Sequence, residues 1–321
     1  GESLARHILY SKRYLSRLLD IDPDSLKLDF EPDTFGHSRN VPEILAEGGV
    51  SYYYHCRGYD GGNSIYRWEA PSGKSVIVYR EPSWYNATVD ANIALHIPEF
   101  CDRYGTDTAL KVYGVGDHGG GPTRRDIEKL KDMSAWSVFP SIRFGTYAGF
   151  FKSLDKIADK LPVVKDELNF IFTGCYTSQS RIKLANRISE AKLNEAEIFS
   201  TLSAVFSNGE YPDSRYHKAW EMTLFNHFHD ILPGSGVTET REYAMGQFQK
   251  ILAATNTGIS QAVRNIASCV DTAGLIEPEN EENRQDSISK GAGVGYGLTG
   301  DYGVPQAERG TGKNRILHFF N

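Results

Sequence analysis

The chain has 321 residues, of which 40% are hydrophobic and 12% aromatic, so it can form a sizeable core, and this composition argues against global disorder. This length suits one large domain and a smaller second one. A formal net charge of -6 argues against a nucleic-acid partner, which would require a basic face. No apolar run approaches the roughly 18 residues of a membrane span. The four cysteines are far apart and form no C-x-x-C pair, so neither a disulfide framework nor a zinc knuckle is expected.

The first half of the chain alternates short apolar segments with helical patterns, which is typical of an α/β fold. The expected helices span residues 3–19, 41–48, 98–104, 123–133 and 147–160. The expected strands span residues 27–31, 50–55, 109–113 and 141–144, together with a hairpin formed by 65–69 and 75–79. We predict one α/β domain over residues 1–162.

The second half of the chain is dominated by helical patterns. Three long helices are expected over residues 179–206, 215–228 and 239–266, and they predict a three-helix bundle within residues 163–270. Residues 271–321 are acidic and then glycine-rich, which predicts a linker. At the end of this segment, residues 316–320 (ILHFF) are apolar and predict the first strand of a truncated β domain.

Asp33 lies in the segment KLDFEPDTFGHS, at the expected C-terminal end of a strand. Because side chains alternate across a strand, Asp29, Glu31 and Asp33 are expected on one side. Catalytic residues of parallel α/β folds lie at this end of the strands. Asp33, followed by His37 in a tight turn, is therefore a candidate nucleophile or metal ligand. The alternative interpretation is that Asp33 caps the helix that follows.

A glycine-rich segment, GVGDHGGGPT, follows the expected strand at residues 109–113. Its glycines allow the backbone to approach a ligand closely, and Asp117 and His118 are the ionisable groups at its tip. A glycosidase needs a second carboxylate at a second strand end, since one acts as nucleophile or base and the other protonates the leaving oxygen. The alternative is a plain turn with a solvated aspartate.

The segment NHFHDILPGSG ends the expected helix at residues 215–228. His227 and His229 are two residues apart and diverge on a helix, so only one is expected to point at a given site. His229, beside Asp230, could bind Zn²⁺ together with Asp33. The alternative is that a histidine here interacts favourably with the last helical carbonyls.

Aromatic residues are abundant near the expected strand ends, which suits a carbohydrate site. Tyr85 follows the hairpin, and Tyr176 lies in the segment FTGCYTSQSRIKLANR before a long helix. Both could lie at the edge of a sugar site, although many of the tyrosines are expected to pack in the core or at its rim.

Taken together, these motifs resemble the family 38 glycoside hydrolases, the zinc-dependent retaining α-mannosidases. EPDTFGHS is similar to the nucleophile segment of that family. YHCRG, GVGDHGGGPT, FTGCYTSQSRIKLANR and FNHFHDILPGSG follow in the order of the family, over roughly residues 1–260. The likeness is greatest to the bacterial and cytosolic-type members, which implies a cytoplasmic location in a bacterium.

The resemblance implies a partial seven-stranded β/α barrel followed by a three-helix bundle. It implies that Asp33 is both nucleophile and zinc ligand and that His229 is a zinc ligand. Arg57 would keep the carboxylate of Asp33 ionised, and Asp230 would lie beside the sugar. Asp117 would be the acid/base, although some members place the acid one position later. In this chain His118 occupies that position, and His118, Tyr85 and Tyr176 would contact the sugar.

The implied activity is hydrolysis of terminal α-D-mannosyl residues of oligosaccharides through a covalent glycosyl-Asp33 intermediate, with Zn²⁺ as cofactor. The implied partner is a mannose-containing oligosaccharide, with neither nucleic acid nor membrane, and a homo-oligomer is left open. Two alternatives are a zinc-dependent carbohydrate deacetylase, in which zinc-bound water attacks, and an inactive mannoside-binding fragment. The deacetylase should carry an H-x-x-x-H pair, which this sequence lacks.

The chain departs from the family pattern in one respect. Members carry an H-x-D motif on the first strand, and both of its residues bind zinc, whereas no H-x-D precedes Asp33. We therefore expect a fragment that lacks the N-terminal strands of the barrel and the C-terminal β domains. Such a fragment is expected to bind zinc weakly and to hydrolyse little by itself.

Overall fold

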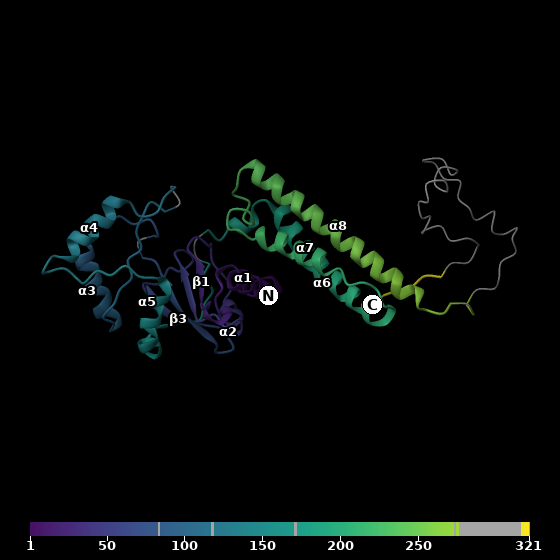
Figure 1. Cartoon of the computed structure of the whole chain (residues 1–321), viewed down its shortest axis with the longest axis horizontal. Helices are drawn as coiled ribbons and strands as arrows, with labels where there is room; N and C mark the ends of the chain where they lie inside the picture. Colours follow the sequence, from purple (N-terminus) through teal and green to yellow (C-terminus); the bar gives the residue numbers. More distant parts are fainter. Residues whose placement is uncertain (83, 117–118, 170–171, 273, 276–315, 321) are drawn as a thin grey trace. The chain divides into compact units, whose positions relative to one another are not determined.

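A computed structural model describes residues 1–82, 84–116, 119–169, 172–272, 274–275 and 316–320 (Figure 1). Its contacts divide the chain into two compact units, residues 1–190 with 221–248 and residues 191–220 with 249–321. The helices are α1 (Glu2–Leu19), α2 (Val41–Glu47), α3 (Ile93–Tyr104), α4 (Arg124–Ser134), α5 (Tyr147–Leu154), α6 (Ser180–Ser207), α7 (Asp213–Phe225) and α8 (Thr238–Ser268). The strands are β1 (Leu28–Glu31), β2 (Tyr52–His55), β3 (Ile65–Glu69), β4 (Ser75–Arg80) and β5 (Val163–Val164).

The strands form one mixed sheet in the first unit, in the order β1-β2-β4-β3-β5. β1 pairs in parallel with β2, and β2 pairs in parallel with β4. β3 and β4 form the antiparallel hairpin that was expected from the sequence. The carboxyl ends of β1, β2 and β4 therefore lie at one edge of the sheet, where Glu31 is opposite His55 and His55 is opposite Arg80. The mixed α/β class is confirmed, whereas the seven-stranded barrel stays a prediction.

Apolar side chains cover both faces of this sheet. On one face, residues of β2, β3 and β4 pack with α2 and with part of α1. The buried members of this cluster are Val41, Leu45, Val50, Tyr53, Tyr59, Tyr66, Trp68, Val76, Val78 and Leu168. On the other face, Phe150, Phe151 and Leu154 of α5 pack against Tyr54 and Tyr79. The sheet is therefore a rigid base for the residues at its carboxyl edge.

The side chains of β1 alternate across the sheet as the sequence predicts. The ring of Phe30 stacks on Tyr54 at 4.9 Å and meets Tyr147 of α5 at 5.0 Å. On the opposite face, the Tyr53 hydroxyl donates to Oε2 of Glu31 over 3.3 Å. This alternation turns the carboxylates of β1 away from α5 and toward the face on which Asp33 follows.

The turn after Asp33 is held against the backbone of a distant segment. The N–H of His37 donates to the carbonyl oxygen of Leu168 over 2.7 Å, and the N–H of Leu168 donates back over 2.9 Å. Gly36 has a φ of +124°, and a Cβ atom there would lie 1.5 Å from the carbonyl oxygen of Leu168. Only glycine fits at residue 36, because any side chain there would overlap the backbone of Leu168.

Most of the expected helices are present, with some shifted ends. α3 begins at Ile93, before the expected start, and contains Pro98. α4 begins with a capping box, in which the side chain of Thr123 accepts from the N–H of Asp126 and the carboxylate of Asp126 accepts from the N–H of Thr123. α5 ends at Leu154 and continues as a 3-10 turn, and α7 ends at Phe225, before the expected end.

Three expected strands are absent from the described part of the chain. Residues 109–113, 141–144 and 316–320 have extended or irregular backbone without strand pairing. A strand requires a neighbour for its backbone groups, and the carbonyl oxygen of Leu110 instead accepts from the Tyr79 hydroxyl over 3.1 Å. The strands predicted over residues 109–113 and 141–144 were wrong, because apolar patterning alone cannot supply a pairing partner, whereas the truncated β domain predicted from residues 316–320 stays a prediction. Most of the expected linker, residues 276–315, lies outside the described residues.

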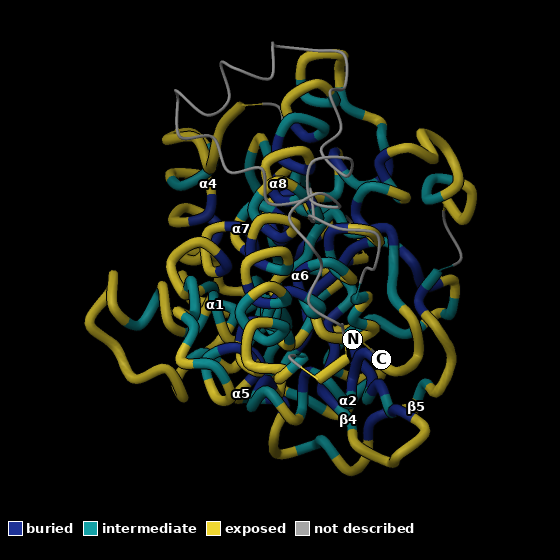
Figure 2. Tube along the Cα trace, turned by 90° about the vertical axis from the view of Figure 1, so that its right-hand side faces the viewer, coloured by how far each residue is buried: buried dark blue, intermediate teal, exposed yellow. Residues whose placement is uncertain are grey.

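The second unit contains the second part of α6, the first part of α7 and the second part of α8. Within it, Nε1 of Trp220 donates to Oε1 of Glu197 over 2.9 Å, and the hydroxyls of Ser200 and Tyr216 are 2.6 Å apart. Buried and exposed residues alternate along the long helices (Figure 2), as expected for amphipathic helices. Among the described residues, no helix is long and apolar enough to cross a membrane.

Candidate active site

Asp33 follows the end of β1, and its carboxylate contacts three side chains. A guanidinium nitrogen of Arg57, which follows β2, forms an ion pair with its Oδ1 atom. The Tyr85 hydroxyl donates to Oδ2 over 3.1 Å, and Nε2 of His229 lies 3.3 Å from the same oxygen. The side chain of Asp33 is 15% exposed. A carboxylate in this position is oriented by its neighbours while one side stays accessible.

The guanidinium of Arg57 is surrounded by aromatic rings as well as by the carboxylate. It lies 5.0 Å from the ring centre of Phe35, 4.9 Å from that of Trp84 and 5.2 Å from that of Phe172. The face of an aromatic ring attracts a cation, and a planar guanidinium can stack on several rings at once. These rings therefore confine the guanidinium of Arg57 from several sides.

His229 and Asp230 lie in the turn that follows α7. Nε2 of His229 is 3.7 Å from Oδ2 of Asp230, whose side chain is 55% exposed. His227 turns away from Asp33: its Nδ1 atom lies 3.0 Å from Nε2 of His7, and its Nε2 atom lies 2.8 Å from Oδ1 of Asn186. The two histidines thus diverge, and His229 alone of the two approaches Asp33.

Tyr85 lies between the glycine-rich segment and Asp33 and is close to both. Gly116 has a φ of +68°, and a Cβ atom there would lie 3.3 Å from the Tyr85 ring and 2.6 Å from Cβ of Asn86. The backbone of this segment therefore passes close to the ring that donates to Asp33. The acid/base candidates Asp117 and His118 lie outside the described residues.

Tyr176 lies beside the site, and one lysine joins its segment to the loop after His229. The ring of Tyr176 meets that of Phe35 edge-on at 6.1 Å, and burial raises the pKa of Tyr176. Nζ of Lys183 donates to the carbonyl oxygen of Pro233 over 2.8 Å and to those of Ser178 and Cys175. Lys183 therefore fixes the two loops together, a role with no signal in the sequence.

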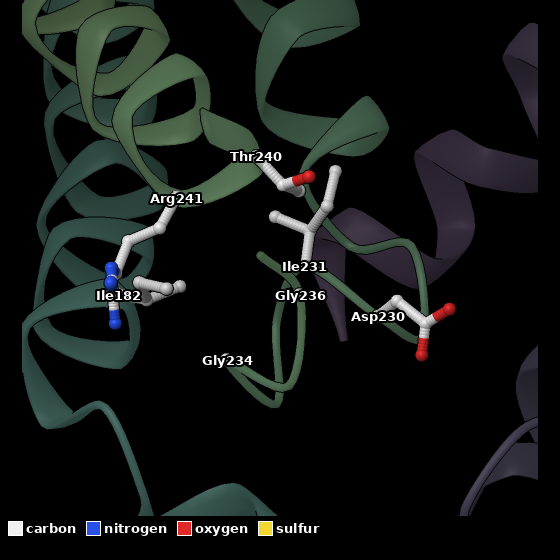
Figure 3. A pocket seen from close by; sticks show the side chains of 7 residues that line it. All are labelled: Ile182, Asp230, Ile231, Gly234, Gly236, Thr240 and Arg241. Atoms are coloured by element: carbon white, nitrogen blue, oxygen red, sulfur yellow. The ribbon is translucent and has the colours of Figure 1, made fainter. Parts of the chain in front are cut away.

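Asp230 also lines a small hollow beside the start of α8 (Figure 3). The other lining residues are Ile182, Ile231, Gly234, Gly236, Thr240 and Arg241. Figure 3 shows Asp230 on one side of the hollow and the side chains of Ile182 and Arg241 on the other. The exposed carboxylate of Asp230 is thus available to a ligand that also approaches His229.

The carboxylates on β1 below Asp33 are neutralised in different ways. Burial raises the pKa of Asp29 to about 8, so this carboxyl is protonated at neutral pH. Burial acts to raise the pKa of Glu31 as well, but the charge and hydrogen bond of His37, together with the hydrogen bond from Tyr53 and the charge of His7, lower that pKa on balance. Nε2 of His37 lies 2.5 Å from Oε2 of Glu31, and this pairing raises the pKa of His37 despite its burial. Neither carboxylate therefore adds an unpaired negative charge beside Asp33.

The arrangement of Asp33 and His229 fits part of a zinc site. Two donors on one tetrahedral Zn²⁺, each at about 2.1 Å, lie about 3.4 Å apart, and Nε2 of His229 is 3.3 Å from Oδ2 of Asp33. Oδ1 of Asp33 is buried and, apart from its ion pair with Arg57, accepts no hydrogen bond from the described residues. Within the described ranges, no group of three or more histidine, cysteine or acidic side chains could hold a metal. The spacing of the pair therefore permits a shared Zn²⁺, for which these two residues would supply only part of the ligands.

Sequence reasoning missed the contacts that hold Asp33 and Arg57 in place. The pairing of Glu31 with His37 has a weak signal, since both residues lie in the motif that was singled out. The rings of Trp84 and Phe172 come from segments far apart in the chain, and no local pattern relates either one to Arg57. Such contacts arise only when the chain is folded.

A sheet with carboxylates and a histidine at its carboxyl edge is compatible with several classes of enzyme, and comparison with known proteins identifies the family. Residues 1–167 match the model of the glycosyl hydrolases family 38 N-terminal domain, and residues 171–266 match that of the alpha mannosidase middle domain. The first match covers more than half of the chain. The chain belongs to glycoside hydrolase family 38.

Several relatives are α-mannosidases. The chain is 31% identical to alpha-mannosidase G of Dictyostelium discoideum over 288 residues, which cover 87% of this chain and 26% of that protein. It is 28% identical to human alpha-mannosidase 2C1 over 240 residues, which cover 72% of this chain and 23% of that protein. The chain thus spans about a quarter of the length of these relatives.

The fold is also similar to that of a solved structure. The crystal structure of an alpha-mannosidase from Enterococcus faecalis superposes with a TM-score of 0.68 and 23% sequence identity. The superposition covers 84% of this chain and 33% of that one. The mixed α/β arrangement is therefore that of a known α-mannosidase.

Proposed function

We propose that the protein to which this chain belongs is a retaining α-mannosidase that removes terminal α-D-mannosyl residues from oligosaccharides. The observation that carries the proposal is the convergence of Arg57, Tyr85 and His229 on Asp33, in a chain of this family. A half-buried carboxylate held by an arginine is suited to act as a nucleophile, because the ion pair orients it.

The proposed reaction has two steps. In the first, an oxygen of Asp33 forms a bond to the anomeric carbon, the glycosidic bond breaks, and its oxygen takes a proton from the acid/base, for which Asp117 is the candidate. In the second, water attacks the anomeric carbon, the same acid/base accepts its proton, and Asp33 leaves with its electron pair. Arg57 and Tyr85 hold the carboxylate in line with the anomeric carbon throughout.

Zn²⁺ is the proposed cofactor, with Asp33 and His229 as ligands. When bound, the ion would supply a Lewis acid that binds and orients sugar hydroxyls. Further ligands would have to come from outside the described residues. Asp230, exposed beside His229, and Tyr176, beside Phe35, are proposed to contact the same sugar.

A mechanism-based trap tests this function. A fluorinated α-mannosyl fluoride should label the protein with one sugar, and peptide mass spectrometry should locate the label on Asp33. Label on another carboxylate would contradict the assigned nucleophile. Release of acetate from an N-acetylated sugar, without label, would support the carbohydrate deacetylase instead. Mannoside binding that survives Asp33→Asn, without label or turnover, would support an inactive mannoside-binding fragment.

A further inference from the structure

His55, the last residue of β2, connects the interior of the sheet to Arg57. Its side chain is completely buried. Its Nδ1 atom lies 2.5 Å from the carbonyl oxygen of Arg57, and its Nε2 atom lies 2.8 Å from the hydroxyl of buried Tyr66 on β3. Both ring nitrogens of this imidazole are therefore engaged, one with the turn that carries Arg57 and the other with the sheet.

The two partners of His55 determine which of its nitrogens carries hydrogen. A carbonyl oxygen can only accept, so the Nδ1–H group donates to Arg57. Burial lowers the pKa of His55 to about 4, so the ring is neutral at neutral pH. Nε2 then has no hydrogen and accepts from the Tyr66 hydroxyl. The neutral Nδ1–H tautomer is the one that satisfies both contacts.

Packing fixes the plane of the imidazole as well. The ring of Tyr53 stacks on that of His55, with centroids 5.2 Å apart and an interplanar angle of 19°. The ring of Tyr66 meets His55 edge-on at 6.2 Å. The histidine therefore presents its Nδ1–H group in one direction, toward the backbone of the turn after β2.

The backbone of Arg57 needs such an anchor, because the rest of its environment is less directional. Phe35, Trp84 and Phe172 attract the guanidinium through ring faces, and these contacts tolerate sliding. The hydrogen bond from His55 instead fixes the position of the Arg57 backbone relative to the end of β2. The position of the guanidinium, and with it the orientation of Asp33, depends on where that backbone lies.

We propose that His55, held in its Nδ1–H tautomer by Tyr66, is a positioning residue that sets Arg57 against the nucleophile Asp33. The proposal rests on the function proposed above and extends it to two buried residues that do not touch the substrate. Tyr66 then contributes to catalysis through His55 alone.

The first test is independent of turnover. In the chain labelled with ¹⁵N-histidine, two-bond nitrogen–proton correlations should show His55 protonated at Nδ1 and unprotonated at Nε2 at neutral pH. Tyr66→Phe should shift the His55 nitrogen signals, because the hydrogen bond to Nε2 is lost. An Nε2–H tautomer in the unmodified protein, or a spectrum unchanged by Tyr66→Phe, would overturn the proposal even in a chain without measurable hydrolysis.

The second test is kinetic and uses the full-length protein to which this chain belongs, with an aryl α-mannoside as substrate. Tyr66→Phe is expected to lower kcat about tenfold with little change in KM, because a misplaced catalytic group costs rate and not ground-state binding. His55→Leu should lower kcat about a hundredfold, and His55→Asn, which keeps an N–H donor near Nδ1, should recover part of that loss.

Tyr79→Phe is the matched control for Tyr66→Phe. Tyr79 is a buried tyrosine of the same sheet whose hydroxyl donates to Leu110 and not to the site. Removing the Tyr79 hydroxyl should lower the melting temperature without changing kcat. Equal losses of kcat in Tyr66→Phe and Tyr79→Phe would overturn the positioning role. If Asp33→Asn hydrolyses the substrate as fast as the unmodified protein, the proposed function is wrong. The tautomer measurement then still shows whether His55 donates a hydrogen bond to the backbone of Arg57.

Discussion

Nε2 of His229 lies 3.3 Å from Oδ2 of Asp33, although one residue follows α7 and the other follows β1. In the absence of metal, this contact is a hydrogen bond or an ion pair. With metal bound, the same two atoms would face one ion. The proposed zinc site would therefore depend on two segments that meet only in the folded chain.

Zinc content per chain, measured after dialysis, should fall in both Asp33→Ala and His229→Ala. Each substitution removes one of the two donors that the described residues bring together. His227→Ala is the matched control, because His227 contacts His7 and Asn186 and not Asp33. Equal zinc in all three variants would exclude the proposed ligand pair.

Arg57→Lys should lower kcat for an aryl α-mannoside about a hundredfold, with the fold retained. A lysine keeps the charge but cannot stack on three rings while holding the carboxylate, because its ammonium is not planar. Arg103→Lys is the control, since Arg103 lies over the Tyr104 ring and contacts Asn63, away from Asp33. Comparable activity in the two variants would mean that charge alone suffices at residue 57.

Asp29 should contribute a loss of stability as the pH rises from about 4 to about 8, and Asp29→Asn should remove this contribution. The folded-state pKa of Asp29 is raised to about 8 by burial, followed by the charge of Glu31. An aspartate in the unfolded chain titrates at about 3.9. Between these values the folded state binds a proton that the unfolded state does not, so stability is lost as the pH rises.

The measurement for Asp29 is urea unfolding at several pH values within that range. Asp102→Asn is the control, because Asp102 is exposed on α3. The pKa of His37 is raised as well, so it adds a pH dependence of the same sign that should persist in Asp29→Asn. A pH profile of Asp29→Asn parallel to that of the unmodified protein would show that Asp29 ionises normally.

Glu31→Gln should lower the free energy of unfolding by about 3 kcal/mol, because it leaves the charge of His37 buried without its partner. The double variant with His37→Asn should recover much of this loss. A double-mutant cycle from urea unfolding measures the coupling between the two residues. Strictly additive losses would mean that the pair does not stabilise the turn that carries Asp33.

Much of the secondary structure could be predicted because local patterns determine it. The amphipathic pattern of α1 and the hairpin of β3 and β4 are both local, and the structure confirms them. The strand predicted over residues 109–113 failed because pairing needs a neighbour that the sequence does not reveal.

The sequence by itself determined that Asp33 follows a strand, because alternation, Pro32 and the glycine at residue 36 act on adjacent residues. Only the tertiary structure decided that His229 and not His227 approaches Asp33, and that Arg57 is enclosed by rings from distant segments. It also decided that His55 holds the Arg57 backbone. The direction of a side chain relative to a remote segment depends on the packing of the whole core, and no local pattern encodes it.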